Sequence, residues 1–227
     1  MNEEKHYRHE LKYKITYAEY LAIRSRLRTV MESDPHARDG TYLIRSVYFD
    51  NVYDKALREK IDGVSKREKF RIRYYNDDFS YITLEKKMKI DKLCLKYDAE
   101  ISEEEFKKIL SGDIDWMKES PSELVKELYA KMRYQNLRPR VRVSYKREPY
   151  IYKAGNVRVT FDSEIRTSMN HMDFIYADDI SATDASGEML MEVKYDAFLP
   201  EIIRVLIQIK GNNQEAFSKY GACRKYS

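Results

Sequence analysis

The stretch KFRIRYYNDDFSYITLEKKMK, residues 69–89, decides the fold, because it predicts two β-strands around an Asn-Asp-Asp turn. Side chains alternate between the two faces of a strand. Arg71 and Arg73 therefore share a face on the first strand, and Glu85 and Lys87 share a face on the second. The positions between them are mostly apolar. The hairpin thus predicts a sheet with one apolar and one charged face, and a single charged face of this kind is typical of solvent exposure.

The same alternation recurs along the chain, which changes the interpretation. Further charged pairs at two-residue spacing, or a multiple of it, are Glu10/Lys12, Lys92/Lys96, Arg140/Arg142 and Glu192/Lys194. If the sheet closes into a barrel, one set of alternating residues faces inward. A lining of Arg and Lys would repel itself unless a polyanion filled it. The few Glu residues in such a lining can hold Mg²⁺ or Mn²⁺, which prefer oxygen ligands.

The remaining segments predict a mixture of strands and helices. Predicted strands cover residues 6–15, 42–49, 92–101, 138–148, 156–162 and 188–195. Predicted helices run from Tyr17 to about Val30, over Val52–Ile61, from Glu103 to Leu110, from Pro121 to Met132, after Pro200, and over Gln214–Tyr220. Thr16 with Glu19, and Ser102 with Glu105, have the spacing of a capping box at the start of a helix.

Composition limits the class of protein. The 227 residues suffice for one domain with a sizeable core or for two small ones, and without repeats or a Pro/Gly/Ser-rich linker we expect one domain over residues 1–227. Forty-two basic against 38 acidic residues give a net charge of +4, which permits an anionic ligand without requiring nucleic acid. Two cysteines make no disulfide framework. With no apolar run that would span a bilayer and no signal peptide, we expect a cytoplasmic protein.

The seven glycines exclude the usual phosphate-binding loops. Neither GxxxxGK[ST] nor GxGxxG occurs in the chain. If the protein binds a nucleotide or polyphosphate, side chains must hold the phosphates. Arg binds phosphate through two parallel hydrogen bonds, and Lys acts as a point charge.

A succession of motifs points to a family. The order HELKYKI, RSVYFDN, KFRIRYY, LEKK, SYKREPY, VRVTFD, MEVKY and FSKYG resembles the polyphosphate polymerase domain of the vacuolar transporter chaperone (VTC) type. That family belongs to the triphosphate tunnel metalloenzymes, which include the CYTH adenylate cyclases and thiamine triphosphatases. The resemblance covers the chain from about Arg8 to Gly221. It implies an α+β fold, in which an antiparallel eight-stranded β-barrel forms a tunnel with flanking helices.

The resemblance also implies a transferase that moves the γ-phosphoryl group of ATP onto inorganic polyphosphate with Mn²⁺ or Mg²⁺. Carried over position by position, the expected catalytic residues are Arg71, Arg73, Lys87, Arg147 and Arg158. The expected substrate-binding residues are Lys12, Lys96, Arg140, Arg142, Lys194, Ser218 and Lys219. Glu192 and Glu85 are the expected metal ligands, and Asp162 matches the aspartate at a strand end. The expected partners are ATP and polyphosphate, with no nucleic acid and no membrane segment.

Departures from the family pattern keep alternatives open. The first strand reads HELKYK instead of the ExExK of the triphosphatase branch, and Arg8 stands two residues before Glu10. This weakens a two-metal triphosphatase and leaves Glu192 as the main metal ligand. A metal-dependent triphosphatase and a non-catalytic polyphosphate-binding module remain alternatives.

Purely structural roles also remain open for single residues. Arg71 and Arg73 can pair with Glu residues of neighbouring strands, and Glu192 can form an interior salt bridge. Lys219 can be an ordinary surface lysine at a helix end. Arg140 and Arg142 can line the tunnel or lie at its mouth.

Overall fold

The structure is a computed structural model that describes residues 8–90, 93–168, 175, 179–181, 189–208 and 217–224. The chain divides into two compact units that alternate along the sequence. Unit 1 comprises Met1–Leu43, Tyr145–Ile165 and Ser181–Lys219. Unit 2 comprises Ile44–Ser144, Arg166–Ile180 and Tyr220–Ser227. The single domain over residues 1–227 stays a prediction.

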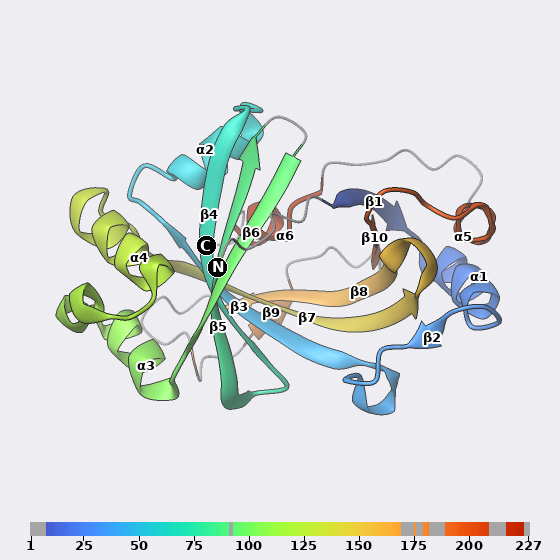
Figure 1. The fold of residues 1–227 in the computed structure, drawn as a ribbon, viewed down its shortest axis with the longest axis horizontal. Coiled ribbons are helices and arrows are strands. Elements are labelled where there is room, and N and C mark those ends of the chain that lie inside the picture. The colour runs from blue at the N-terminus through green and yellow to red at the C-terminus, as the bar shows by residue number, and fades with distance from the viewer. Residues whose placement is uncertain are drawn as a thin grey trace. The chain divides into compact units, whose positions relative to one another are not determined.

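The strands in the described part of the chain form one sheet (Figure 1). Its main path has the order β1-β10-β8-β7-β3-β4-β5-β6, with β2 beside β7 and β9 beside β8. The strands are β1 (His9–Ile15), β2 (Glu32–Ser33), β3 (Tyr42–Asp50), β4 (Lys66–Tyr75), β5 (Asp78–Ile90), β6 (Leu93–Ile101), β7 (Arg138–Tyr152), β8 (Val157–Ser168), β9 (Asp179–Ser181) and β10 (Met189–Tyr195). Strands β3, β7, β8 and β9 contribute residues to both units.

The α+β class and the eight-stranded antiparallel path are confirmed, since the defined pairs of β1, β10, β8 and of β3, β4, β5, β6 are antiparallel. Among the described residues, however, the order ends at β1 and β6, so the sheet is not closed by hydrogen bonds. Strand β6 carries Lys96, Asp98 and Glu100 at alternate positions. Charges along a terminal strand are a common protection of a sheet edge against further pairing.

The helices follow the local signals of the sequence. They are α1 (Tyr17–Leu27), α2 (Lys55–Ile61), α3 (Glu103–Ser111), α4 (Glu123–Tyr134), α5 (Glu201–Leu206) and α6 (Lys219–Cys223), with short 3₁₀ turns η1 (Arg38–Gly40), η2 (Asp115–Glu119) and η3 (Ala154–Asn156). Both predicted capping boxes are present, at the starts of α1 and α3. No helix in the described residues is long and apolar enough to cross a lipid bilayer.

Some element boundaries differ from the predictions. Helix α2 begins at Lys55 instead of Val52, because Asp54 has a left-handed backbone (φ 52°) that cannot continue a helix. Strand β7 extends through Pro149 to Tyr152, where it pairs with β2. The predicted helix over Gln214–Tyr220 falls partly outside the described residues, which show α6 beginning at Lys219.

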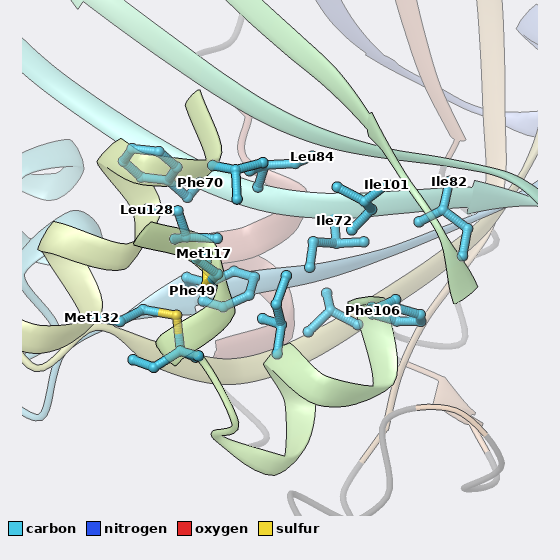
Figure 2. Close-up of a cluster of buried hydrophobic side chains, with 14 of the residues drawn as sticks. Phe49, Phe70, Ile72, Ile82, Leu84, Ile101, Phe106, Met117, Leu128 and Met132 are labelled. Carbon is cyan, nitrogen blue, oxygen red and sulfur yellow. The ribbon is translucent and has the colours of Figure 1, made fainter. Parts of the chain in front are cut away.

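Unit 2 buries the apolar face of the hairpin predicted from residues 69–89. Figure 2 shows Phe70, Ile72, Ile82 and Leu84 packed against side chains of α3, η2 and α4. Register fixes the geometry, because Ile72 lies opposite Leu84 and Arg71 lies opposite Glu85 on the other face. Burying the first pair therefore places the second on the charged face.

Unit 1 repeats this division. Helices α1 and α5 pack on β8 and β10 through a second core that includes Ile23, Phe161, Met191 and Ile203. On those strands the alternate positions carry charge, Glu192 among them. Each unit thus has one sheet face packed by helices and one face that bears Arg, Lys and Glu.

The buried face of unit 2 leads to a stability prediction. Leu84 is fully buried, so Leu84→Ala should lower the free energy of unfolding by about 2–5 kcal/mol through lost burial and the cavity left behind. Urea denaturation measures this change. The matched control is Leu21→Ala, the same truncation at an exposed helix position (45% exposed), which should stay within about 0.5 kcal/mol of the parent protein. Equal losses in both variants would contradict the assignment of the core face.

Candidate functional site

Three adjacent strands of unit 1 build a charged face. In register, Lys12 of β1 lies opposite Glu192 of β10, and Glu10 lies opposite Lys194. Lys194 in turn lies opposite Arg158 of β8. Residues two apart share a face, so these side chains gather on the face turned away from α1 and α5.

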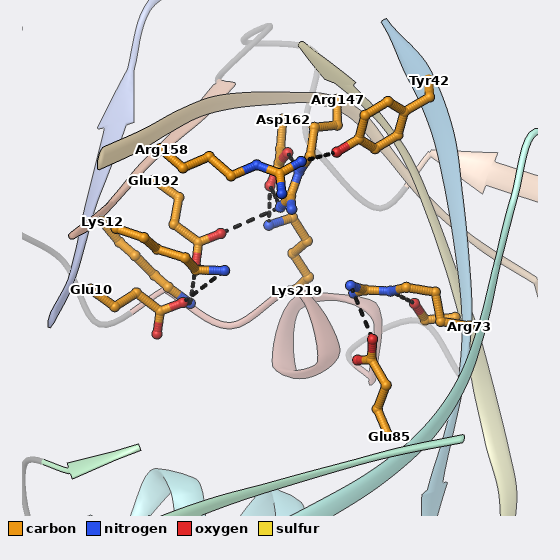
Figure 3. A network of polar contacts seen from close by, with 12 residues as sticks. Glu10, Lys12, Tyr42, Arg73, Glu85, Arg147, Arg158, Asp162, Glu192 and Lys219 are labelled. Carbon is orange, nitrogen blue, oxygen red and sulfur yellow. Dashed lines mark hydrogen bonds and ion pairs between the residues drawn. The ribbon is translucent and has the colours of Figure 1, made fainter. Parts of the chain in front are cut away.

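Glu192 lies within this group of cations (Figure 3). Its carboxylate is 3.7 Å from Lys12 Nζ, 3.5 Å from Lys194 Nζ and 3.3 Å from Arg147 Nη2. Burial raises the pKa of Glu192, but the charges of Lys194 and Lys12, a hydrogen bond with Glu10 and the charge of Arg147 outweigh burial and hold the pKa well below its usual range. Glu192 is therefore an ionised carboxylate among basic side chains.

Glu10 brings a second carboxylate to the same lysines. One of its oxygens lies 3.7 Å from Lys12 Nζ and 3.8 Å from Lys194 Nζ. Within the described residues, no three His, Cys, Asp or Glu side chains form a group that could hold a metal. Two carboxylates still fit a hard cation, provided that phosphate oxygens and water complete its shell, as is usual for Mg²⁺. Glu192 and Glu10 are the residues of unit 1 that fit Mn²⁺ or Mg²⁺.

The Asp162 carboxylate contacts two of the predicted phosphate-binding residues, Arg147 and Lys219. Arg147 donates to its two oxygens through Nε at 2.6 Å and Nη2 at 2.8 Å, and Lys219 Nζ lies 2.5 Å from it. Burial raises the pKa of Asp162, yet Arg147 and Lys219 lower it overall. Lys219 Nζ also lies 4.6 Å from the ring centroid of Tyr145. Lys219 is 10% exposed and so is not an ordinary surface lysine.

Arg158 has partners that the sequence did not reveal. Its Nη2 donates to Asp34 Oδ2 at 2.7 Å and to the Tyr42 hydroxyl at 2.6 Å. Asp34 lies beside Pro35 in a loop before β3, where no periodic pattern marks a residue for a role. This contact was missed because it joins residues 124 positions apart.

The charged face of unit 2 is built around Glu85, which is 3% exposed. Arg71 Nε donates to it at 2.6 Å, and Lys96 Nζ lies at 3.1 Å. Arg73 Nη1 lies at 3.7 Å (Figure 3). Arg73 Nε also donates to Ser46 Oγ at 3.1 Å. The prediction that Arg71, Arg73 and Glu85 share one face of the sheet is therefore confirmed. The structure adds Ser46 as a hydrogen-bond partner of Arg73.

Glu85, like Glu192, lies among cations. Burial raises its pKa, but Arg71, Arg73 and Lys96 outweigh burial and lower it. Asp98 lies opposite Glu85 on β6 and contacts the same Lys96. Glu85 has the geometry of a residue that orients two guanidinium groups, and its role as a metal ligand stays a prediction.

A line of lysines crosses the same face. Lys69 of β4 lies opposite Lys87 of β5, and Lys87 lies opposite Lys96 of β6. Like charges directly opposite each other on neighbouring strands are unfavourable. Lys96 is paired with Glu85 and Asp98, and Lys87 is exposed, so an anion can reach this row. Lys69 was not among the residues predicted from the sequence.

Three of the residues predicted to bind substrate have surroundings that differ from those of the residues above. Arg142 is fully buried and donates to the Ile175 carbonyl at 2.8 Å. Arg140 Nη2 lies 3.7 Å from Asp54. Ser218 is half-buried just before α6. The contacts of Arg142 and Arg140 are structural, and a substrate role for either of them, or for Ser218, stays a prediction.

Comparison with known proteins supplies the family. A search of curated proteins found no match. A solved structure of a candidate adenylate cyclase from Bacillus halodurans is 16% identical, with a TM-score of 0.52 over 91% of this chain and 88% of that chain. A candidate adenylyl cyclase from Hippeastrum, described as having a dominant triphosphatase activity, is 12% identical, with a TM-score of 0.55 over 96% and 95%. These likenesses show a shared fold.

The family itself follows from the sequence match. The model of the VTC domain matches residues 7–227, nearly the whole chain. The chain therefore belongs to the VTC domain family.

Proposed function

We propose that this protein is a metal-dependent polyphosphate polymerase that transfers the γ-phosphoryl group of ATP to the end of an inorganic polyphosphate chain. Membership of the VTC domain family supports the reaction class. The observation that carries the proposal is the row of Lys69, Lys87 and Lys96, which lie directly opposite one another on a face that also holds Arg71 and Arg73. Such a row gathers positive charge along one line and suits a chain of repeated negative charges.

Each unit carries its own set of cations suited to phosphate binding. In unit 2 we assign this role to Arg71, Arg73, Lys87 and Lys96. In unit 1 we assign it to Arg147, Arg158, Lys12, Lys194 and Lys219. Glu85, Asp162 and Asp34 orient Arg71, Arg147 and Arg158 respectively, so the cations are held in place before the substrate arrives, which is the main contribution a protein can make to phosphoryl transfer.

The reaction needs no Ser or Cys nucleophile. An oxygen of the terminal phosphate of the acceptor chain forms the new bond to the γ-phosphorus, while the bond from that phosphorus to the β,γ-bridging oxygen breaks and ADP leaves. Arginine and lysine side chains neutralise the phosphate oxygens as charge shifts onto the leaving group. Glu192 and Glu10 would hold Mn²⁺ or Mg²⁺, which supplies charge neutralisation on phosphate oxygens.

Product analysis tests the proposal against its two alternatives. The protein is incubated with ATP and Mn²⁺ or Mg²⁺, and products are separated by gel electrophoresis and ³¹P NMR. Chains of many phosphates together with ADP are the expected result. Free phosphate without chains would overturn the polymerase in favour of a triphosphatase, the activity described for the Hippeastrum protein of the same fold. Tight polyphosphate binding without turnover would establish a binding module.

Loss of one guanidinium should weaken binding in a defined way. Arg71→Ala removes a cation with a 22% exposed side chain, and hydrogen bonds to charged groups are worth about 1.5–3 kcal/mol. Metal-free binding of inorganic tripolyphosphate, measured by titration calorimetry, should weaken by that amount. Arg204→Ala is the control, since this exposed arginine pairs with Glu201 on α5. Unchanged affinity in Arg71→Ala would remove Arg71 from the site.

Neutralising Glu192 should separate metal binding from phosphate binding. Glu192→Gln keeps the size of the side chain but removes the charge, so turnover and apparent Mn²⁺ affinity should fall together. Metal-free tripolyphosphate binding should hold or improve, because a negative charge has left an anion site. Calorimetry and activity at varied Mn²⁺ measure the two effects.

The matched control is Glu148→Gln. Glu148 is also buried in unit 1, but it contacts Arg24, Tyr20 and Tyr150. This variant should lose stability without a change in Mn²⁺ dependence. If Glu192→Gln behaved in the same way, melting earlier yet turning over normally with unchanged Mn²⁺ dependence, Glu192 would be a salt-bridge residue and its metal role would be wrong.

A further inference from the structure

Tyr48 of β3 lies opposite Arg71 of β4, in the next position across the charged face of unit 2. Its hydroxyl accepts a hydrogen bond from Arg71 Nη1 at 2.9 Å, and the guanidinium carbon lies 5.7 Å from its ring centroid. Glu85 accepts from Nε of the same guanidinium at 2.6 Å. Arg71 is thus held at two separate nitrogens by residues of two neighbouring strands.

Tyr48 is itself held rigidly. It is 9% exposed, and its ring stacks on Tyr220 of α6 with centroids 5.2 Å apart. The Tyr220 hydroxyl donates to Asp50 Oδ2 at 2.5 Å. Asp50, fully buried, also accepts from the backbone amides of Asn51, Ala56 and Leu57. A continuous series of contacts therefore runs from the start of α2 to the guanidinium of Arg71.

We propose that Tyr48 is a positioning residue that fixes the guanidinium of Arg71 for phosphate binding and limits that binding to pH values at which its hydroxyl is protonated. The inference rests on the proposed function of Arg71. A hydroxyl that accepts from Nη1 while Glu85 accepts from Nε defines the plane of the guanidinium. Phosphate then meets an ordered group, and less side-chain freedom is lost on binding.

The charges around Tyr48 explain the pH limit. Arg71 of β4 contacts both its hydroxyl and its ring, and Tyr220 of α6 stacks on the ring. Lys69 Nζ lies 5.0 Å from the centroid of the Tyr220 ring. Burial raises the pKa of Tyr48, but Arg71, Arg73 and Lys69 outweigh burial and lower the pKa to about 8. Among the carboxylates around these partners, Glu85 accepts from Arg71 and Asp50 accepts from Tyr220.

The sign of the effect follows from the charge. Below pH 8 the neutral hydroxyl orients Arg71 and leaves its positive charge for an anion. Above pH 8 the phenolate pairs with Arg71 and repels phosphate, so affinity falls. By reciprocity, a bound polyanion should raise the pKa of Tyr48.

The test compares Tyr48→Phe with the parent protein in metal-free binding of inorganic tripolyphosphate, by calorimetry from pH 6.5 to 9.5. At pH 6.5 the variant should bind about two- to tenfold more weakly, because Arg71 is less ordered. At pH 9.5 it should bind as tightly as the parent or more tightly, because it cannot form a phenolate. The ligand titrates equally in both experiments, so the ratio of the two affinities isolates Tyr48. A ratio that does not change with pH would overturn the inference.

A second measurement needs no stable variant. Ultraviolet absorbance at the tyrosinate band should show one tyrosine of the parent protein ionising near pH 8, and tripolyphosphate should shift this ionisation to higher pH. The matched control is Tyr150→Phe, which removes a different buried hydroxyl, one that donates to Glu148, and which should retain both the pH profile and the shift. Absence of an ionisation near pH 8 would refute the pH limit.

The outcomes separate this inference from the function on which it rests. If the parent protein fails to bind tripolyphosphate at any pH, the proposed function is wrong and the role of Tyr48 falls with it. If the parent binds and Arg71→Ala weakens binding, while Tyr48→Phe matches the parent at every pH, only the role of Tyr48 is wrong.

Discussion

The pairing of buried cations with carboxylates is the constraint on which the charged faces depend. Arg147 and Lys219 are both largely removed from water, and an unpaired charge in such a place costs several kcal/mol. Asp162, fully buried between them, makes their burial possible. Glu85 does the same for Arg71 and Arg73 in unit 2. Each charged face is therefore stable without a ligand, although it is built mostly from groups that repel each other.

This arrangement has a consequence for phosphate binding. A carboxylate that holds a guanidinium by one edge fixes its direction but also reduces the local positive charge. Buried ion pairs of this kind contribute little net stability compared with apolar packing. Their presence on the faces opposite the helices, where apolar residues would fold as well, favours a role in orienting cations. In the row of Lys69, Lys87 and Lys96, by contrast, the strand register places like charges opposite one another.

Much of the fold was predictable because local rules determine it. The apolar face of residues 69–89, the capping boxes of α1 and α3, and the shared face of Arg71, Arg73 and Glu85 all follow from spacing within a segment, and the structure confirms them. Contacts between distant segments were not predictable. Asp34 and Tyr42 reach Arg158, and Tyr48 stacks on Tyr220, because of strand register and loop paths that no local pattern encodes.

Alternation also has a limit, which strand β7 and strand β5 illustrate. On β7, Arg142 and Arg147 stand at positions of opposite parity, so an unbroken strand cannot present both on one face. On β5 the neighbours Glu85 and Lys86 divide in the same way. Glu85 holds Arg71 on the charged face, whereas Lys86 turns to the helix side, where it pairs with Glu68 and Glu127 and covers the ring of Phe70. Two adjacent charged residues thus serve different purposes, one orienting a candidate ligand-binding group and the other attaching a helix. Composition cannot separate these roles, but on β5 and β10 the parity of a residue relative to the buried apolar positions can, and this is why Glu85 and Glu192 enter the functional argument while Lys86 does not.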